Sequence, residues 1–290
     1  SVMSICKVEN FYDAIQKYKT LKELNKRIDI EIKYLNKSCG SVASLKRYFT
    51  MYRNYLKSKI QPSQKIGSKS LLNLLLSKFA LNVEQQQTFK NNHVLEISHA
   101  QKNLRKIYDV QKFIDTGVNL LSAISVYDRI LGLCALTGRR PAEIGCTAIL
   151  KPTEDKRLAL FEGQLKVKDR DDIQPYIIPL LSDYKAINNT LLSIREQKPQ
   201  FIDKPLLFNG IASKELGIRA RKYFKDIVEG DIQVKNLRAI YATIAYDYYC
   251  KSSSVGYITV SMNSYFSKIL GHGENDVVTC GSYIDFCLPK

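Results

Sequence analysis

A strongly apolar segment, residues 118–138, constrains the fold of this chain more than any other feature. Its only charged residues are Asp128 and Arg129, and it lacks the about 18 consecutive apolar residues of a membrane span. A segment of this kind is typical of a helix that is buried on most of its faces. We therefore expect residues 118–138 to form a core helix of a globular domain.

The composition and the hydrophobic pattern of the chain change near Asp115, and this change predicts two domains. Residues 1–115 are polar, basic and helical in pattern, whereas residues 116–290 combine apolar helices with short segments of alternating polarity. Helices are predicted over residues 4–37, 44–59, 70–81, 83–110, 118–138, 182–197, 213–230, 234–250 and 259–271. Strands are predicted over residues 146–150, 157–168 and 174–181. The predicted fold class is mainly α with a small antiparallel β-sheet in the second domain.

Positive charge is concentrated in the first predicted domain. The chain carries 44 Lys and Arg against 28 Asp and Glu, a formal net charge of +16. Residues 1–110 hold 20 of the basic and 8 of the acidic residues, a balance of 20 − 8 = +12. Such a surface attracts a polyanion, most commonly nucleic acid, through phosphate contacts and counterion release. Charge alone also fits a protein that binds anionic lipid, or one that is simply basic.

The seven cysteines are scattered along the chain and contain no C-x-x-C pair. An odd number without close pairs argues against a disulfide framework and against a zinc site, so no metal is expected. The first residues have no signal-peptide pattern. Together with the missing membrane span, this predicts a cytoplasmic protein.

Short motifs follow one another through the second predicted domain. The sequence TGRRPAEI occupies residues 137–144, directly after the apolar helix, and GQLK occupies residues 163–166 in a predicted β-hairpin. KNLR at residues 235–238 opens a predicted helix. LGHG at residues 270–273 is followed by SYIDF at residues 282–286. Each motif alone is a weak signal, and their common order along the chain is what gives them weight.

In this order the motifs resemble the boxes of the tyrosine recombinases, which are T-G-x-R-x-x-E-[LI], a hairpin lysine, H-x-x-R, and L-G-H followed by a tyrosine. Two departures stand out. Lys235 replaces the usual histidine of H-x-x-R, and the interval from His272 to Tyr283 is 283 − 272 = 11 residues, slightly longer than usual. These departures and the GQLK segment resemble the telomere resolvases, also called protelomerases, more than the integrases.

The resemblance implies a set of catalytic side chains. They are Tyr283, Arg140, Lys166, Arg238, His272 and Lys235. A tyrosine phenol has an ordinary pKa of about 10 and is a weak nucleophile, so the site must stabilise it as it attacks phosphorus. Two arginines, helped by the histidine, would hold the oxygens of the pentavalent transition state. Lys166 would donate the proton that the leaving 5′-oxygen needs, with Lys168 as the alternative because it lies two residues along the same strand.

The resemblance further implies what the protein does. It would cut inverted-repeat telomere-junction DNA as a homodimer, through a 3′-phosphotyrosine, and rejoin the strands as covalently closed hairpin ends. Fixed cations take the place of a metal ion in such sites, so we expect activity in EDTA, without ATP and without any cofactor. The alternatives are a conventional tyrosine site-specific recombinase or integrase, a type IB topoisomerase, and a non-catalytic DNA-binding protein of the same fold.

The first domain would then grip double-stranded DNA. Basic side chains near its aromatic segments, or near the catalytic boxes, are the candidates for contact with the duplex or the hairpin. They are Arg139, Lys168, Lys46, Arg47, Arg53, Lys57, Lys102 and Arg105. The resemblance also implies a bacterial nucleoid-associated or phage-encoded protein. Members of the family normally continue after the nucleophile, so we expect a further C-terminal segment beyond Lys290.

Overall fold

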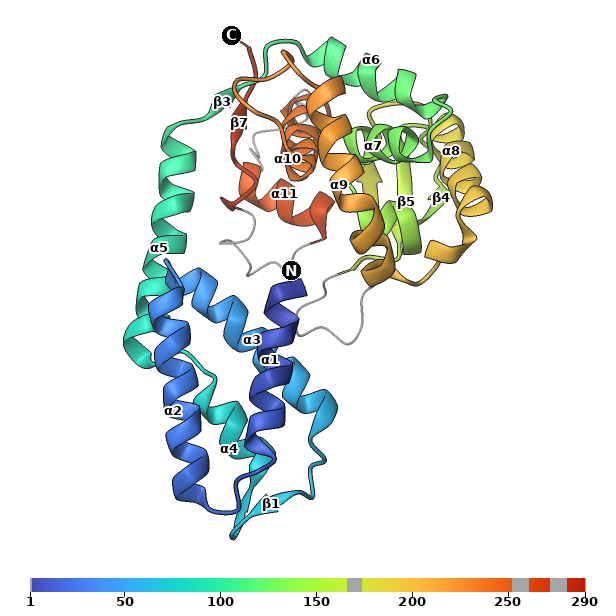
Figure 1. Cartoon of the computed structure of the whole chain (residues 1–290). Coiled ribbons are helices and arrows are strands. Elements are labelled where there is room, and N and C mark those ends of the chain that lie inside the picture. The colour runs from blue at the N-terminus through green and yellow to red at the C-terminus, as the bar shows by residue number, and fades with distance from the viewer. Residues whose placement is uncertain (1, 166–173, 252–260, 272–280, 290) are drawn as a thin grey trace. The chain divides into compact units, whose positions relative to one another are not determined.

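The computed structural model describes residues 2–165, 174–251, 261–271 and 281–289 (Figure 1). The packing divides the chain into two compact units, Ser1–Glu96 and Ile97–Lys290. The predicted boundary at Asp115 lies inside a helix whose residues Phe113 and Ile114 are buried in the core of the second unit. The unit boundary therefore precedes the predicted one.

The first unit is a small helical bundle. It contains α1 (Val2–Ile15), α2 (Leu21–Ser38), α3 (Val42–Lys59), β1 (Lys65–Ile66), β2 (Lys69–Ser70), α4 (Leu71–Lys78) and the first part of α5 (Val83–Lys102). The side chains of Thr20, Ser41 and Ser70 each accept a hydrogen bond from a backbone N–H in the first turn of the next helix, which fixes where α2, α3 and α4 begin. The apolar faces meet in an aromatic core, where the rings of Tyr52 and Phe79 stack at 4.7 Å.

The second unit is mostly helical and holds one antiparallel sheet. Its elements are β3 (Arg105–Lys106), α6 (Val110–Leu121), α7 (Val126–Thr137), η1 (Glu143–Thr147), β4 (Ile149–Pro152), β5 (Leu158–Glu162), β6 (Tyr176–Pro179), α8 (Tyr184–Gln197), η2 (Pro199–Phe201), α9 (Pro205–Tyr223), α10 (Val234–Ala245), η3 (Tyr246–Lys251), α11 (Met262–Leu270) and β7 (Phe286–Cys287). The sheet has the order β4-β5-β6, and Phe161 on the central strand pairs with Leu150 and Tyr176 on its neighbours. The predicted fold class, mainly α with a small antiparallel sheet, is confirmed.

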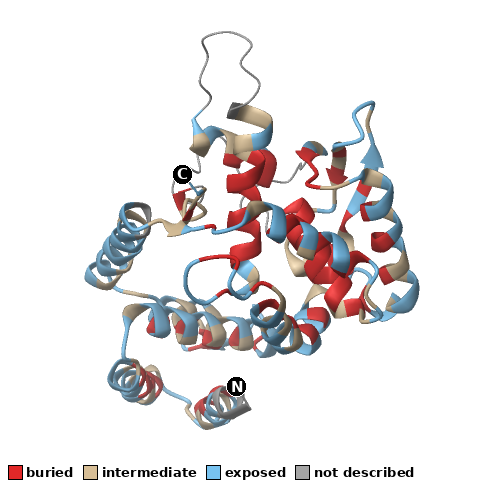
Figure 2. Ribbon diagram, turned by 90° about the horizontal axis from the view of Figure 1, so that it is seen from above, coloured by how far each residue is buried: buried red, intermediate tan, exposed pale blue. Residues whose placement is uncertain are grey.

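Helices α7 and α10 form the centre of this unit (Figure 2). Every residue of α7 except Tyr127 is buried, and α10 is buried from Asn236 to its end at Ala245. The TGRR motif follows α7 and the KNLR motif opens α10, so buried core helices position both motifs. No helix within the described ranges is long and apolar enough to cross a lipid bilayer.

The apolar segment 118–138 does not form the single helix that its composition predicts. It is divided between α6 and α7, with Ser125 as the N-cap of α7. The two helices pack closely through glycines, since a Cβ on Gly132 would lie only 2.7 Å from the carbonyl oxygen of Gly117. The apolar residues are therefore buried by one another as well as by the rest of the core.

The polar helix predicted over residues 83–110 also ends early, because its last residues pair with the end of the chain. β3 runs parallel to β7, with Arg105 opposite Phe286. The Arg105 N–H donates to the Asp285 carbonyl at 2.9 Å, and the Ile107 N–H donates to the Cys287 carbonyl at 2.9 Å. Backbone pairing over such a sequence distance leaves no local pattern.

Candidate active site

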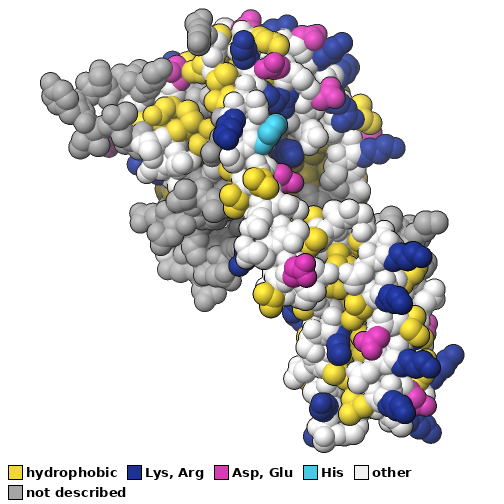
Figure 3. All heavy atoms as spheres, turned by 90° about the vertical axis from the view of Figure 1, so that its left-hand side faces the viewer, with side chains coloured by type: hydrophobic (Ala, Val, Ile, Leu, Met, Phe, Trp, Pro, Cys, Tyr) yellow, Lys and Arg dark blue, Asp and Glu magenta, His cyan; other side chains and the backbone are white. Residues whose placement is uncertain are grey.

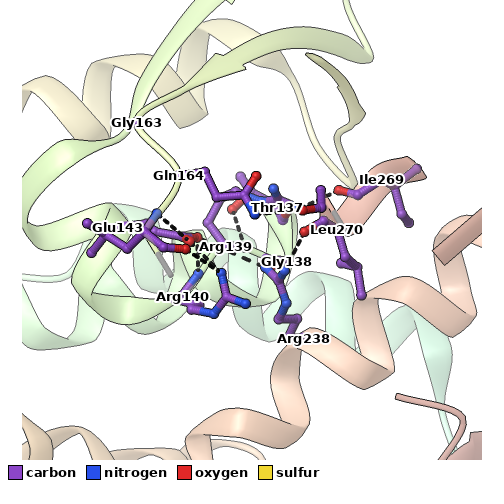
Figure 4. Close-up of polar contacts among 12 residues, drawn as sticks. Thr137, Gly138, Arg139, Arg140, Glu143, Gly163, Gln164, Arg238, Ile269 and Leu270 are labelled. Atoms are coloured by element: carbon purple, nitrogen blue, oxygen red, sulfur yellow. Dashed lines mark hydrogen bonds and ion pairs between the residues drawn. The ribbon is translucent and has the colours of Figure 1, made fainter. Parts of the chain in front are cut away.

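The carboxylate of Glu143 organises the candidate active site. Glu143 lies in η1, directly after the TGRR turn, and its side chain is fully buried. Its Oε1 atom accepts from Arg140 Nη1 at 2.7 Å and from the Leu165 N–H at 3.2 Å, and its Oε2 atom accepts from the Arg140 N–H at 2.8 Å (Figure 4). Arg238 Nη1 lies 4.0 Å from Oε2. One buried carboxylate therefore contacts both predicted catalytic arginines and the hairpin that leads to Lys166.

The same cluster determines how Glu143 titrates. Burial alone would raise the pKa of this carboxyl, but the positive charges of Arg238, Arg139 and Arg140 outweigh burial and lower the pKa below its ordinary value. Glu143 is therefore ionised at neutral pH.

Arg140 lies at the accessible edge of the cluster. Its side chain is 19% exposed, and its Nη1 atom also donates to the Leu165 carbonyl at 3.2 Å. Burial lowers the pKa of Arg140, but Glu143 and then the Tyr283 hydroxyl more than reverse this shift. The Tyr283 side chain thus lies within the electrostatic reach of Arg140.

Arg238 is held more deeply than Arg140. It lies on α10 with only 5% of its surface exposed, and it donates from Nη1 to the Gly138 carbonyl at 2.6 Å and from Nη2 to the Leu270 carbonyl at 2.7 Å. Its Nε atom is buried and has no hydrogen-bond partner among the residues that the structure describes. Burial, together with the neighbouring Arg139 and Arg140, lowers the pKa of Arg238 to about 10. A buried cation with an unused N–H is well suited to receive an anion.

The backbone of Gly138 makes the first of these contacts possible. Gly138 ends α7 in the left-handed conformation, with φ of 65°, which turns the chain toward α10. A Cβ at this position would lie 2.1 Å from Cδ1 of Tyr241. Only glycine satisfies both the conformation and the close packing.

Tyr283 meets the cluster from the end of the chain. The Arg238 guanidinium lies 5.4 Å from the centre of the Tyr283 ring, and Tyr283 is partly exposed. β7 begins three residues later and is fixed by β3. Arg105 reinforces this attachment, because its Nε and Nη2 atoms donate to the carbonyls of Glu229 and Asp231 at 2.6 and 2.7 Å, and its guanidinium stacks over Phe286.

The interpretation of Arg139 as a DNA contact is wrong. Its residue surface is 1% exposed, because its guanidinium packs on the rings of Phe161 and Tyr176. It donates to the Tyr176 hydroxyl at 2.5 Å and to the Ile269 carbonyl at 2.5 Å. In the sequence, only their positions in the motif distinguish Arg139 from Arg140. In the structure Arg139 is buried and supports the packing of the core.

Three predicted site residues, Lys166, Lys168 and His272, lie outside the described residues. Lys235 is exposed at the start of α10. Burial raises the pKa of Asp285, and Lys235 together with Arg105 opposes this shift. Lys235 therefore lies within the electrostatic reach of the segment that follows Tyr283.

The predicted DNA contacts of the first unit lie along α3. Lys46, Arg47 and Lys57 are exposed, and Arg53 is partly exposed. The Nζ atom of Lys46 lies 3.8 Å from the centre of the Phe89 ring. Figure 3 shows Lys and Arg side chains spread over the helices of this unit with few acidic ones among them. Elsewhere, Lys102 is exposed at the end of α5, but Arg105 already uses its donors on carbonyls, which differs from the role expected for it.

Sequence reasoning missed Gln164. Its Nε2 atom donates to the Gly271 carbonyl at 2.7 Å, and its Oε1 atom is buried with no partner in the part of the chain that the structure describes. The GQLK motif contains this glutamine, and its position two residues before Lys166 was the available signal.

Comparison with known proteins identifies the family. The family described as the telomere resolvase ResT/TelK catalytic domain matches residues 103–286. The telomere resolvase ResT of Borreliella burgdorferi is 24% identical over 167 residues, which are 56% of this chain and 34% of that protein. The match therefore spans about a third of the length of that curated relative.

Solved structures share the fold. Protelomerase TelA complexed with DNA hairpin product has a TM-score of 0.84 at 22% identity, with 99% of this chain and 89% of that chain covered. TelA covalently complexed with substrate DNA gives a TM-score of 0.82 at 22% identity, with coverage of 100% and 89%. Protelomerase TelK complexed with substrate DNA gives 0.64 at 18% identity, with coverage of 97% and 63%.

The family match begins two residues before β3 and ends at the first residue of β7, so it contains Arg140, Glu143, Arg238 and Tyr283 in one continuous region. It covers well over half of the 290 residues. This chain belongs to the family of the telomere resolvase ResT/TelK catalytic domain.

Proposed function

We propose that this chain is a telomere resolvase that cuts inverted-repeat telomere-junction DNA and rejoins the strands as hairpin ends. The observation that carries the proposal is the convergence of Arg140, Arg238 and Tyr283 around the buried carboxylate of Glu143. The two cations and the phenol come from three distant segments of the sequence. Membership of the family supports the substrate and the hairpin product.

In the first step the Tyr283 oxygen attacks the scissile phosphorus. The bond from phosphorus to the tyrosine oxygen forms, the bond from phosphorus to the 5′-oxygen breaks, and the DNA is left with a 3′-phosphotyrosine and a free 5′-hydroxyl. The phenol of the partly exposed Tyr283 releases its proton to solvent water. The 5′-oxygen gains a proton from Lys166, the residue that the family resemblance assigns to this role. The second step reverses the chemistry, with the 5′-hydroxyl of the opposite strand as the nucleophile. The product is a covalently closed hairpin.

The arginines stabilise the charge that develops on the phosphoryl oxygens. Arg140 is accessible at the edge of the cluster. The Nε of Arg238, which no described residue binds, is a donor held in place before the substrate arrives. Donors fixed in a buried site lower the barrier more than donors in water, because they need no reorganisation during the reaction. His272 would complete the set around the phosphate, as the family resemblance implies.

The first unit would hold the duplex through phosphate contacts made by its exposed lysines and arginines along α3. Two copies of the chain would act on one inverted repeat, because each half of the repeat presents the same scissile phosphate. The β3–β7 pairing holds the segment after Tyr283 to its own chain, so the nucleophile and the arginines of one site come from one protomer. A cytoplasmic protein associated with the bacterial nucleoid or encoded by a phage fits this substrate.

The decisive experiment is a denaturing gel of an inverted-repeat plasmid treated with the protein in EDTA and without ATP. We expect linear DNA whose ends renature instantly after denaturation, together with a covalent protein–DNA adduct. Tyr283→Phe should remove the adduct and leave DNA binding intact. Recombined circles would indicate a conventional recombinase, relaxed circles a topoisomerase, and unchanged DNA a binding protein without catalysis.

A further inference from the structure

The carboxyl end of α11 is held by three side chains from three parts of the catalytic unit. Helix α11 ends at Leu270 with Gly271 as its C-cap, and the last carbonyls of a helix have no partner within it. Here Ile269, Leu270 and Gly271 each receive a side-chain hydrogen bond at their carbonyl. The donors are Arg139 Nη2 at 2.5 Å, Arg238 Nη2 at 2.7 Å and Gln164 Nε2 at 2.7 Å, in that order (Figure 4).

The three donors come from three of the four motifs. Arg139 follows α7 in the TGRR turn, Gln164 follows β5 in the hairpin, and Arg238 lies on α10. His272 follows Gly271 directly in the sequence, and Lys166 lies two residues after Gln164. The carbonyl clamp, defined as these three donors and three carbonyls, is therefore close in sequence to two of the predicted catalytic residues.

Arg139 and Arg238, two of the three donors, also stabilise the fold in another way. The guanidiniums of Arg139 and Arg238 are nine-tenths or more buried, and positive charge at the carboxyl end of a helix stabilises it. Gln164 carries no charge and contributes only a directional contact. Its effect on the site should therefore be separable from the stability of the core.

The local structure fixes Gln164 tightly. Gly163 before it adopts φ of 89° and its carbonyl accepts from Thr147 Oγ1 at 2.5 Å, so the turn that follows β5 is anchored to η1. On the other side, a Cβ on Gly271 would lie 2.2 Å from Gln164 Oε1 and 2.3 Å from the Tyr176 hydroxyl. The amide packs directly against the backbone of Gly271.

Leu165, the next residue, is bound just as closely. Its N–H donates to Glu143 Oε1 at 3.2 Å, and its carbonyl accepts from Arg140 Nη1 at 3.2 Å. The two residues that lead to Lys166 thus contact Arg140 and Glu143 on one side and the end of α11 on the other.

We propose that Gln164 is a positioning residue: through its contact with the Gly271 carbonyl it fixes the backbone of Leu165, the residue before Lys166 in the sequence, against Arg140 and Glu143. The inference rests on the proposed function, in which Lys166 protonates the leaving 5′-oxygen. Loss of the amide contact slows leaving-group protonation, while DNA binding is retained.

The test compares two substrates in single-turnover cleavage. One is an inverted-repeat junction that the full chain cleaves, and the other carries sulfur in place of the bridging 5′-oxygen at the scissile phosphate. A thiolate leaves without a proton, so the second substrate does not need the lysine. Gln164→Glu keeps the shape of the side chain and removes the donor, Gln164→Met removes its polarity, and Gln200→Glu makes the same change at an exposed position in η2.

We expect the Gln164 variants to cleave the ordinary substrate about 10- to 100-fold more slowly than the wild type, with unchanged DNA affinity and thermal midpoint. On the sulfur substrate their rates should approach that of the wild type, and Gln200→Glu should match the wild type on both. A wild-type rate on the ordinary substrate, or an equal loss on both substrates, would overturn the inference. If one variant fails to fold, the other decides the question.

The outcome is distinguishable from failure of the proposed function. In that case the wild-type chain itself would form no covalent adduct with either substrate. A wild type that cleaves both substrates, beside variants that are slow on both, would refute only the role of Gln164.

Discussion

The guanidinium of Arg238 lies 5.4 Å from the centre of the Tyr283 ring, although 45 residues separate the two in the sequence (283 − 238). The same guanidinium donates to the Gly138 and Leu270 carbonyls. Arg238 therefore joins the end of α7, the end of α11 and the segment that carries Tyr283.

Arg238→Lys should abolish most of the cleavage. A lysine ammonium cannot reproduce the planar fork that bonds two carbonyls and leaves Nε for the phosphate. We expect the rate of covalent adduct formation to fall about 10²- to 10³-fold, as for loss of one donor to a transition-state oxygen, with DNA binding retained in a gel-shift assay. Arg221→Lys, the same change at an exposed position of α9, should have no effect. Equal adduct formation by Arg238→Lys would remove this residue from the catalytic set.

Glu143→Gln should destabilise the second unit in a pH-dependent manner. The pKa of Glu143 is lowered in the folded state, so its carboxylate stabilises the fold above its ordinary pKa of 4.5, and this contribution is lost as pH falls through the folded pKa. Removing the charge leaves buried arginines without their counterion, at a cost of about 3–5 kcal/mol near neutral pH. Urea unfolding from pH 7 to well below pH 4.5 should show a constant difference from wild type down to about the ordinary pKa of 4.5, and a narrowing difference below it as pH falls toward the folded pKa. A difference independent of pH would contradict the ion-pair role.

Gly138→Ala should be strongly destabilising. The left-handed backbone and the approach of Tyr241 both oppose a Cβ at this position, and we expect a loss of about 2 kcal/mol or more in the free energy of unfolding. Gly210→Ala is the matched control, because Gly210 lies within α9 with no atom within 4 Å of a Cβ. There the substitution should stabilise the helix by up to about 1 kcal/mol. Thermal denaturation of both variants measures the contrast.

The salt dependence of DNA binding should report the contacts made by α3. Each phosphate contact that is lost reduces the slope of log K against log salt by about 0.9, so Arg47→Gln and Lys57→Gln should each flatten it by that amount. Lys151→Gln should change it less, because the Lys151 ammonium already pairs with Glu162 at 2.5 Å. Unchanged slopes for both α3 variants would show that DNA lies elsewhere.

The sequence predicted the elements whose signal is local. The apolar face of α3 follows helical spacing, and the apolar composition of residues 118–138 predicted the burial of α7, although not its separation from α6. The order of the motifs placed Arg140, Arg238 and Tyr283 in one hypothesis. In the structure Arg140 and Arg238 lie beside the Glu143 carboxylate, and Tyr283 lies close to both arginines. Their catalytic roles, and those of Lys166 and His272, stay predictions for the experiments above.

The pairing of β3 with β7 could not be predicted from the sequence. The helix predicted over residues 83–110 ends at Lys102 because Arg105 and Lys106 pair with a strand at the far end of the chain, and no periodicity within the segment encodes that partner. The burial of Arg139 is a similar case. Two adjacent arginines differ only in the direction of their side chains, and the tertiary packing of Phe161 and Tyr176 decides which one enters the core.

The parallel pairing of β3 with β7 sets a lower limit for dissecting this protein. A fragment that began at Ile107 would lose two contacts made by Arg105: its N–H bond to the Asp285 carbonyl, and the stacking of its guanidinium over Phe286, three residues after Tyr283. The segment that carries Tyr283 would then be less firmly attached to the rest of the unit. A fragment intended to cleave DNA must therefore begin no later than Lys102, the last residue of α5.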